Sequence, residues 1–190
     1  YWTVRVNEAA HQVPTSVALE IDGRGGHDVV TIVGTDADDR VALWPDHCAL
    51  SGADYRVTAV NVESVTAVGG GGADVAFLYD DPQGDDRFWA EPDRARLYGE
   101  GFANQVLSFP HVFGVSHGGV DAAVLRDDPA GDDRFWAEPD RAKLYGEGFA
   151  NQALSFPYVY GVSLGGVDAA VLRADLAGDD RLWAEPDRAK

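Results

Sequence analysis

Apolar and polar residues alternate with a period of two along most of the chain, as in "RFWAE" at 134–138 and "YVYGVS" at 158–163. Because successive side chains of a strand point to opposite faces, this alternation predicts short, half-buried β-strands. Glycine and proline interrupt the alternation at "DDPAG", "EPD", "GEGF" and "LGG", which are turn signals. No stretch carries the capped amphipathic pattern of a helix. The pattern therefore predicts an all-β protein.

The strand pattern recurs in tandem units of 47 residues. "GDDRFWAEPDRA" occupies 84–95 and again 131–142, and "GDDRLWAEPDRA" occupies 178–189. The units form one continuous array: 1–36 is a degenerate N-terminal repeat or cap, 37–83 a degenerate repeat, 84–130 and 131–177 clear repeats, and 178–190 a truncated repeat. Since the array breaks off inside a unit, we expect the chain to be a piece of a longer repeat protein.

Units this short and this similar cannot close a domain of their own, so each must bury its inner face against the next. This favours a parallel β-solenoid, or β-helix, over the alternatives of small tandem sandwiches and propeller blades. We expect two coils per repeat, because about 24 residues is closer to an ordinary β-helical coil than 47. Positions that keep their residue between copies, such as Leu97 and Leu144, are predicted to face inward. Positions that change, such as Arg96 and Lys143, are predicted to face solvent.

The composition is that of a folded, acidic protein: 45% of residues are hydrophobic, 25% are charged, and the net charge is −17. This charge argues against a nucleic acid or an anionic lipid surface as partner, because both require a basic face, and it favours cations. No apolar run approaches the roughly 18 residues that would span a bilayer, so membrane insertion is not expected. The single cysteine, Cys48, excludes an intrachain disulfide framework; it aligns with Ala95 and is predicted to be a small buried side chain.

Aspartates cluster on both sides of one turn in each unit, as in "LRDDPAGDDR" at 125–134. Calcium binds several carboxylate and carbonyl oxygens, and Gly131 allows a tight turn that brings such groups together. We therefore predict calcium as the bound cofactor. The predicted ligands are Asp80, Asp81, Asp85 and Asp86, then Asp127, Asp128, Asp132 and Asp133, then Asp175, Asp179 and Asp180, with Ala174 in place of a fourth aspartate. The alternative is a set of solvated aspartates that each cap their own turn.

Two resemblances bear on this site. The segments "GGVDAAVL" and "AGDDRFWA" resemble the calcium-binding RTX nonapeptide repeats of secreted bacterial proteins, which are glycine-rich with an aspartate before an alternating apolar strand. The 47-residue period departs from the RTX pattern. The whole unit is also similar to the repeats of large, uncharacterised secreted bacterial proteins with a D-x-x-G-D-D-x-F core. These resemblances imply aspartates at turns between stacked strands and an extracellular or cell-surface location.

Aromatic residues also recur with the repeat. We expect one column of rings on one face of the solenoid, comprising Trp89, Trp136 and Trp183 beside Phe113, Tyr158 and Tyr160. An exposed aromatic row can stack on sugar rings or can be buried between two solenoids. The remaining interpretation is partial burial against turns of the same chain.

Little in the sequence points to catalysis. The five histidines occupy unrelated repeat positions, whereas an active site is normally one constellation that breaks a repeat. No phosphate-binding glycine loop, Cys/His metal spacing or nucleophile elbow occurs. We therefore expect no enzyme, with a β-helical polysaccharide lyase or hydrolase as the enzymatic alternative.

These observations predict a structural protein: a segment of an extracellular surface fibre, adhesin or matrix polymer that self-associates into fibres or arrays. The alternative function is a glycan-binding module that presents the aromatic column to a polysaccharide.

Overall fold

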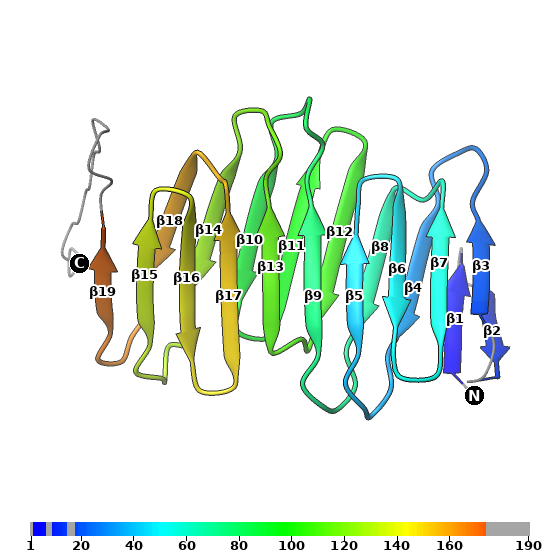
Figure 1. Cartoon of the computed structure of the whole chain (residues 1–190), viewed down its shortest axis with the longest axis horizontal. Helices are drawn as coiled ribbons and strands as arrows, with labels where there is room; N and C mark the ends of the chain where they lie inside the picture. Colours follow the sequence, from blue (N-terminus) through cyan, green and yellow to red (C-terminus); the bar gives the residue numbers. More distant parts are fainter. Residues whose placement is uncertain (1, 7–8, 15–17, 174–190) are drawn as a thin grey trace.

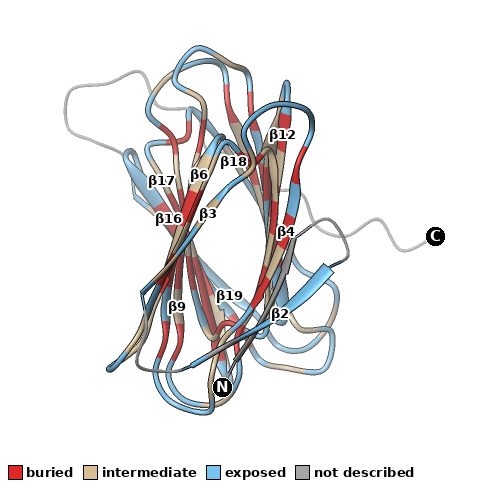
Figure 2. Ribbon diagram, turned by 90° about the vertical axis from the view of Figure 1, so that its right-hand side faces the viewer, coloured by how far each residue is buried: buried red, intermediate tan, exposed pale blue. Residues whose placement is uncertain are grey.

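The computed structural model describes residues 2–6, 9–14 and 18–173, and its regular elements are all β-strands (Figure 1). They form two sheets that face each other across a shared interior (Figure 2). Sheet A has the strand order β18 (Tyr158–Val162), β14 (Ala122–Arg126), β10 (Arg87–Glu91), β11 (Arg94–Gly99), β12 (Phe102–Leu107), β8 (Ser64–Val68), β4 (Val29–Val33), β1 (Trp2–Val6) and β2 (Ala9–Val13). Sheet B has the order β19 (Ala169–Leu172), β15 (Arg134–Glu138), β16 (Arg141–Gly146), β17 (Phe149–Leu154), β13 (His111–Val115), β9 (Val75–Tyr79), β5 (Arg40–Leu43), β6 (His47–Ser51), β7 (Arg56–Val60) and β3 (Ala18–Asp22). These ranges contain no helix that is long and apolar enough to cross a membrane.

In strands β4 to β14, every second residue points into the interior between the sheets. In β9, Ala76 and Leu78 are fully buried, whereas Val75, Phe77 and Tyr79 on the outer face are only half-buried. The inward side chains of both sheets form one continuous hydrophobic cluster. Each unit is therefore stabilised by burying its apolar face against its neighbours, as in other solenoids.

The predicted facing of individual residues is confirmed. Leu97 and Leu144 are buried, Arg96 is exposed, and Lys143 is partly exposed on the outer face. Cys48 is buried, and this burial raises the pKa of its thiol to about 12. The thiol is therefore a small core side chain without nucleophilic reactivity at neutral pH.

The coils stack by parallel strand pairing, which confirms the prediction of an all-β, parallel β-solenoid. β8 pairs in parallel with β4 and β12, and β13 pairs in parallel with β9 and β17. Each clear repeat also contains an antiparallel three-stranded meander that the sequence reasoning did not identify, β10–β11–β12 or β15–β16–β17. Gly101 and Gly148, with φ of 83° and 78°, form the turns before the third meander strands, because glycine adopts this left-handed conformation without strain.

Successive repeats begin in opposite sheets. Repeat 84–130 places its meander in sheet A, β13 in sheet B and β14 in sheet A, whereas repeat 131–177 places its meander in sheet B, β18 in sheet A and β19 in sheet B. We call each visit of the chain to one sheet a pass, whether it is a single strand or a meander, and two passes, one in each sheet, make a coil. A repeat has three passes and therefore makes one and a half coils, not the predicted two. The meander accounts for the difference, because it keeps within one sheet the residues that would have formed another pass. Equivalent residues of neighbouring repeats therefore lie on opposite faces.

Candidate metal centre

Buried aspartates lie where the chain crosses from one sheet to the other. Asp121 immediately precedes β14, and Asp127 immediately follows it. In the preceding repeat, Asp74 and Asp80 flank β9 in the same way. Each of these strands therefore connects two aspartates on opposite edges of the solenoid.

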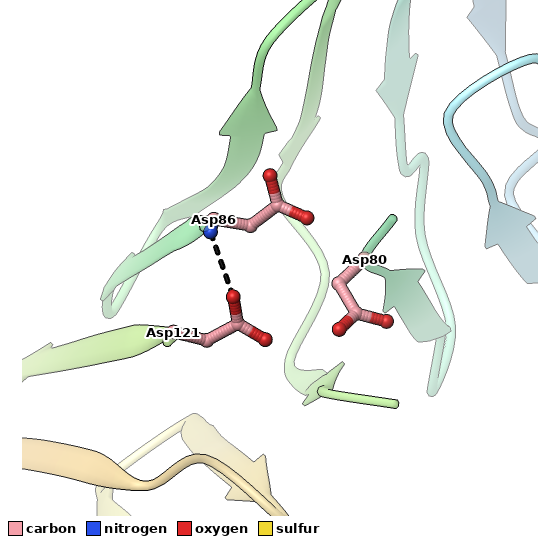
Figure 3. A group of neighbouring side chains, drawn as sticks. All are labelled: Asp80, Asp86 and Asp121. Carbon is pink, nitrogen blue, oxygen red and sulfur yellow. Dashed lines mark hydrogen bonds between the residues drawn. The ribbon is translucent and has the colours of Figure 1, made fainter. Parts of the chain in front are cut away.

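The first cluster, called the first trio below, consists of Asp80, Asp86 and Asp121 (Figure 3). One carboxylate oxygen of each residue lies within 4.8 Å of those of the other two. The residues are only 2%, 1% and 0% exposed. Asp80 follows β9, Asp86 precedes β10 and Asp121 precedes β14, so three separate segments of chain each contribute one carboxylate.

Backbone and hydroxyl donors hold the first trio in place. The backbone N–H of Asp86 donates to Asp121 Oδ1 at 2.7 Å, and the Ser116 hydroxyl donates to Asp121 Oδ2 at 2.6 Å. The backbone N–H of Asp81 donates to Asp86 Oδ2 at 2.7 Å, and that of His117 donates to Asp80 Oδ2 at 2.7 Å. These bonds link consecutive crossings, so the trio ties neighbouring coils together.

A glycine makes room for the central carboxylate. A Cβ added to Gly99 would lie 1.6 Å from Asp86 Oδ1, and one added to Gly146 would lie 1.7 Å from Asp133 Oδ1. Both of these oxygens are buried and accept no hydrogen bond from any residue that the structure describes. An unpaired buried carboxylate oxygen is costly, and the protein groups that the structure describes leave one such oxygen in each cluster.

The second trio repeats the first 47 residues later and consists of Asp127, Asp133 and Asp168. Its scaffold is the same: the N–H of Asp133 donates to Asp168 Oδ1 at 2.9 Å, and the Ser163 hydroxyl donates to Asp168 Oδ2. Asp127 and Asp133 are buried, whereas Asp168 is exposed. A cavity lined in part by the trio and by Phe135 adjoins it.

The trios differ in one neighbour. The first has His117, whose Nδ1 lies 3.0 Å from Asp80 Oδ1, and the second has Leu164 at the equivalent position. Among the described residues, no lysine or arginine forms an ion pair with either trio. The negative charge of the second trio is therefore not compensated by any cationic side chain within the described part of the chain.

The electrostatic consequence is visible in the carboxyl groups themselves. Burial, reinforced by the nearby carboxylates of Asp121 and Asp80, raises the pKa of Asp86 to about 6. Burial also raises the pKa values of Asp121, Asp127 and Asp133. A group of this kind is neutralised either by a proton or by a cation that replaces it.

The crossing at Asp39 and Asp74 lacks a third carboxylate. Asp39 and Asp74 keep the scaffold bond, from the N–H of Asp39 to Asp74 Oδ1 at 2.8 Å, but Gly34 stands where Asp80 stands in the first trio. The Thr35 hydroxyl donates to Asp39, and the Tyr55 side chain lies beside the Asp39 carboxylate. Two carboxylates and two hydroxyl groups thus replace three carboxylates.

The structure brings together four of the predicted metal ligands, Asp80 with Asp86 and Asp127 with Asp133. Asp121 and Asp168 were missed, although each is the aspartate that precedes an alternating strand in a "GGVDAAV" segment. The predicted ligands that do not join a trio are Asp81, Asp85, Asp128 and Asp132, whose carboxylates accept hydrogen bonds from the backbone N–H groups of Gln83, Val120, Ala130 and Val167. Asp175, Asp179 and Asp180 lie outside the described residues.

The predicted single aromatic column is wrong. Trp89 lies on β10 in sheet A and Trp136 on β15 in sheet B, because successive repeats begin in opposite sheets. Phe113 is in sheet B, whereas Tyr158 and Tyr160 are in sheet A. Trp183 lies outside the described residues.

Comparisons of the chain with protein-family models, curated proteins and solved structures found no match. Its function must therefore be inferred from the geometry and chemistry of its own residues.

Proposed function

We propose that this chain is a structural segment of an extracellular fibre, adhesin or matrix polymer, and that calcium ions at the aspartate trios hold its coils together. The observation that carries the proposal is the recurrence of the aspartate trio in two successive repeats, with five of the six carboxylates buried. A solenoid of like units can be lengthened without changing its cross-section, which suits a fibre or a spacer.

Calcium is the cation that best fits the trios. It prefers several oxygen ligands in flexible geometry, and each trio offers three carboxylates whose oxygens lie within 4.8 Å of one another. Two carboxylates 4.8 Å apart repel each other by about 3.5 kcal/mol at an effective dielectric constant of about 20. A divalent ion between them removes this repulsion and links three chain segments at once.

The proposal is tested by thermal unfolding at pH 7 with millimolar calcium or with chelator. Any ligand that binds only the folded state stabilises it, by about 2.7 kcal/mol per site when its concentration is 100 times Kd. We expect calcium to raise the melting temperature of the parent. Asp127→Asn should abolish the part of this rise in melting temperature that comes from the second trio. In chelator, the melting temperature of the variant should equal or exceed that of the parent, because one of the repelling charges is gone.

Asp132→Asn is the matched control. It removes the same charge five residues away, from a carboxylate that only accepts a backbone hydrogen bond. It should retain the full response to calcium. A parent whose melting curve is the same in calcium and in chelator, or equal responses of the two variants, would overturn the proposal.

A further inference from the structure

The charges of this protein are segregated between strands and turns. Strands β4 to β19 contain nine arginine or lysine residues and only two acidic residues, Glu91 and Glu138. The other described acidic residues from 28 onward lie in the connections, although the whole chain carries a net charge of −17. The outer faces of the sheets are therefore locally basic between acidic edges.

The basic residues gather at one place on sheet A, the outer face of β14, β10 and β11, called the first basic patch. Its outward side chains are Arg87, Trp89, Glu91, Arg94, Arg96, Tyr98 and Arg126. The register places Trp89 opposite Arg96, and Arg87 opposite Tyr98, so cationic and aromatic side chains alternate across the strands.

Only part of this charge is neutralised internally. Glu91 pairs with both Arg94 and Arg126. Arg87 and Arg96 form no ion pair with any described carboxylate. Trp89 is 36% exposed beside them, with the Arg126 guanidinium 5.2 Å from its ring centre. The patch therefore presents the guanidinium groups of Arg87 and of Arg96, the latter over the Tyr98 ring, without a described carboxylate partner and next to a partly exposed indole.

The repeat builds the same patch on the opposite face. In sheet B, β15, β16 and the residue after β19 present Arg134, Trp136, Glu138, Arg141, Lys143, Tyr145 and Arg173. Glu138 again pairs with two arginines, Arg141 and Arg173. A shallow groove in this patch is lined by Arg134, Trp136 and Tyr145.

We propose that the two basic patches bind an acidic polysaccharide, one polymer strand on each face. A uronic acid unit combines an apolar ring face with a carboxylate, and the patch offers an indole beside a guanidinium group, which bind these two features respectively. The net charge of the chain does not prevent this contact, because charges more than about 8 Å away are largely screened at physiological ionic strength.

Other polyanions fit less well. Double-stranded nucleic acid carries one charge per roughly 1.7 Å of its axis, and this density would bring many phosphates against the acidic edges. The acidic edge of a second copy of the chain offers carboxylates beside single proline rings, Pro82 and Pro129, and not the repeated ring and carboxylate of a uronic acid polymer. Because the patches lie on opposite sheets, one chain bound through both would cross-link two polymer strands.

The test measures binding of polygalacturonate to the folded chain in chelator, with the fully methyl-esterified polymer as the neutral probe. The first-patch variant is Arg87→Ser with Arg96→Ser, and the second-patch variant is Arg134→Ser with Lys143→Ser. The control is Arg24→Asn with Arg56→Ser, which removes the same charge at two exposed positions away from Trp89 and Trp136.

We expect the parent to bind the acidic polymer and not the ester, with affinity falling as salt rises. Each patch variant should bind roughly fivefold to tenfold more weakly and should lose the cross-linking seen as turbidity, while the control changes less than twofold. The chelator separates this binding from any effect of calcium at the trios.

Four results would overturn the proposal: binding only when calcium is added, equal binding of the ester, equal weakening by the control variant, or tighter binding of single-stranded DNA. Concentration-dependent self-association lost in the same patch variants would instead assign the patches to a second copy of the chain, and would overturn it too. Circular dichroism of each variant confirms that it is folded.

Discussion

The crossing at Asp39 and the crossing at Asp86 have the same backbone hydrogen bonding but differ in the number of carboxylates. In both, the N–H of the central aspartate donates to an aspartate 35 residues later, at 2.8 and 2.7 Å. Gly34 at the first crossing corresponds to Asp80 at the second, and Tyr55 corresponds to Phe102. At the first crossing the central carboxylate accepts a hydrogen bond from the Thr35 hydroxyl and lies beside Tyr55, whereas at the second one of its oxygens has no hydrogen-bond donor among the described residues.

This difference separates two roles of the aspartates. The fold needs two carboxylates to accept backbone N–H groups, and the Asp39 crossing shows that these two suffice. At the Asp86 crossing, the third carboxylate, Asp80, adds negative charge to a buried site, and Phe102 in place of Tyr55 removes a nearby hydroxyl group. Such an addition is explained if the trio binds a cation.

The largest effect is expected from Gly99→Ala. The new Cβ would lie 1.6 Å from Asp86 Oδ1, so the backbone or the carboxylate must move, and we expect a loss of about 4 kcal/mol in the free energy of unfolding. Gly101→Ala, two residues away, has open space and should cost only about 1 kcal/mol for its positive φ.

Chemical denaturation in urea measures both losses. Adding Asp86→Ala to Gly99→Ala removes the oxygen that the new methyl group meets. The double variant should therefore lose less unfolding free energy than the sum of the losses of the two single variants. Additive losses would show that the close approach of Gly99 to Asp86 does not exist in solution.

A smaller effect is expected from pH in the presence of chelator. The folded-state pKa of Asp86 is about 6, above its ordinary value of 3.8, so the folded state keeps a proton that the unfolded state releases. Stability from this group is therefore greatest below pH 3.8, is lost as the pH rises to 6, and stays low above pH 6. We expect a loss of about 2 to 3 kcal/mol over this range.

Asp86→Asn isolates this contribution, because the difference between parent and variant removes the titration of the other carboxyl groups. Denaturant unfolding at pH 4.5 and pH 7 should show a shallower decline for the variant in chelator. In calcium the parent should regain stability at pH 7. A variant with the same pH dependence as the parent would contradict the assigned role of Asp86.

The smallest effect is expected from Phe102→Tyr, which gives the first trio the hydroxyl found at the Asp39 crossing. A hydrogen bond to Asp86 should raise stability by about 1 kcal/mol in chelator, because it satisfies a buried carboxylate oxygen. Thermal unfolding in chelator and in calcium measures the change. A variant destabilised in chelator would mean that Asp86 needs no additional donor.

The sequence predicts the fold more fully than the site. Strict alternation in segments such as "RFWAE" and the 47-residue period predict stacked strands correctly, because burial on one face imposes both. The period does not reveal that each repeat makes three passes, each within one sheet. A meander and a pass have the same alternation, so the sheet that holds Trp136 could not be predicted from the pattern.

The partners of Asp86 were only half predictable. Asp80 lies close in sequence and was identified, whereas Asp121 is 35 residues away and is brought near only by the stacking of coils. Asp81 and Asp85 are also aspartates and lie closer to Asp86 in sequence. Their carboxylates, however, accept hydrogen bonds from backbone N–H groups in the turns. Composition and spacing do not distinguish an aspartate that caps a turn from one that faces a neighbouring coil.

Calcium binding at the trios is tested most directly by a crystal structure of the chain grown in calcium, with anomalous difference maps recorded at long wavelength. We expect one peak among Asp80, Asp86 and Asp121 and one among Asp127, Asp133 and Asp168, with none at Asp39 and Asp74. Maps without a peak at either trio, or with an equal peak at the Asp39 crossing, would contradict this expectation.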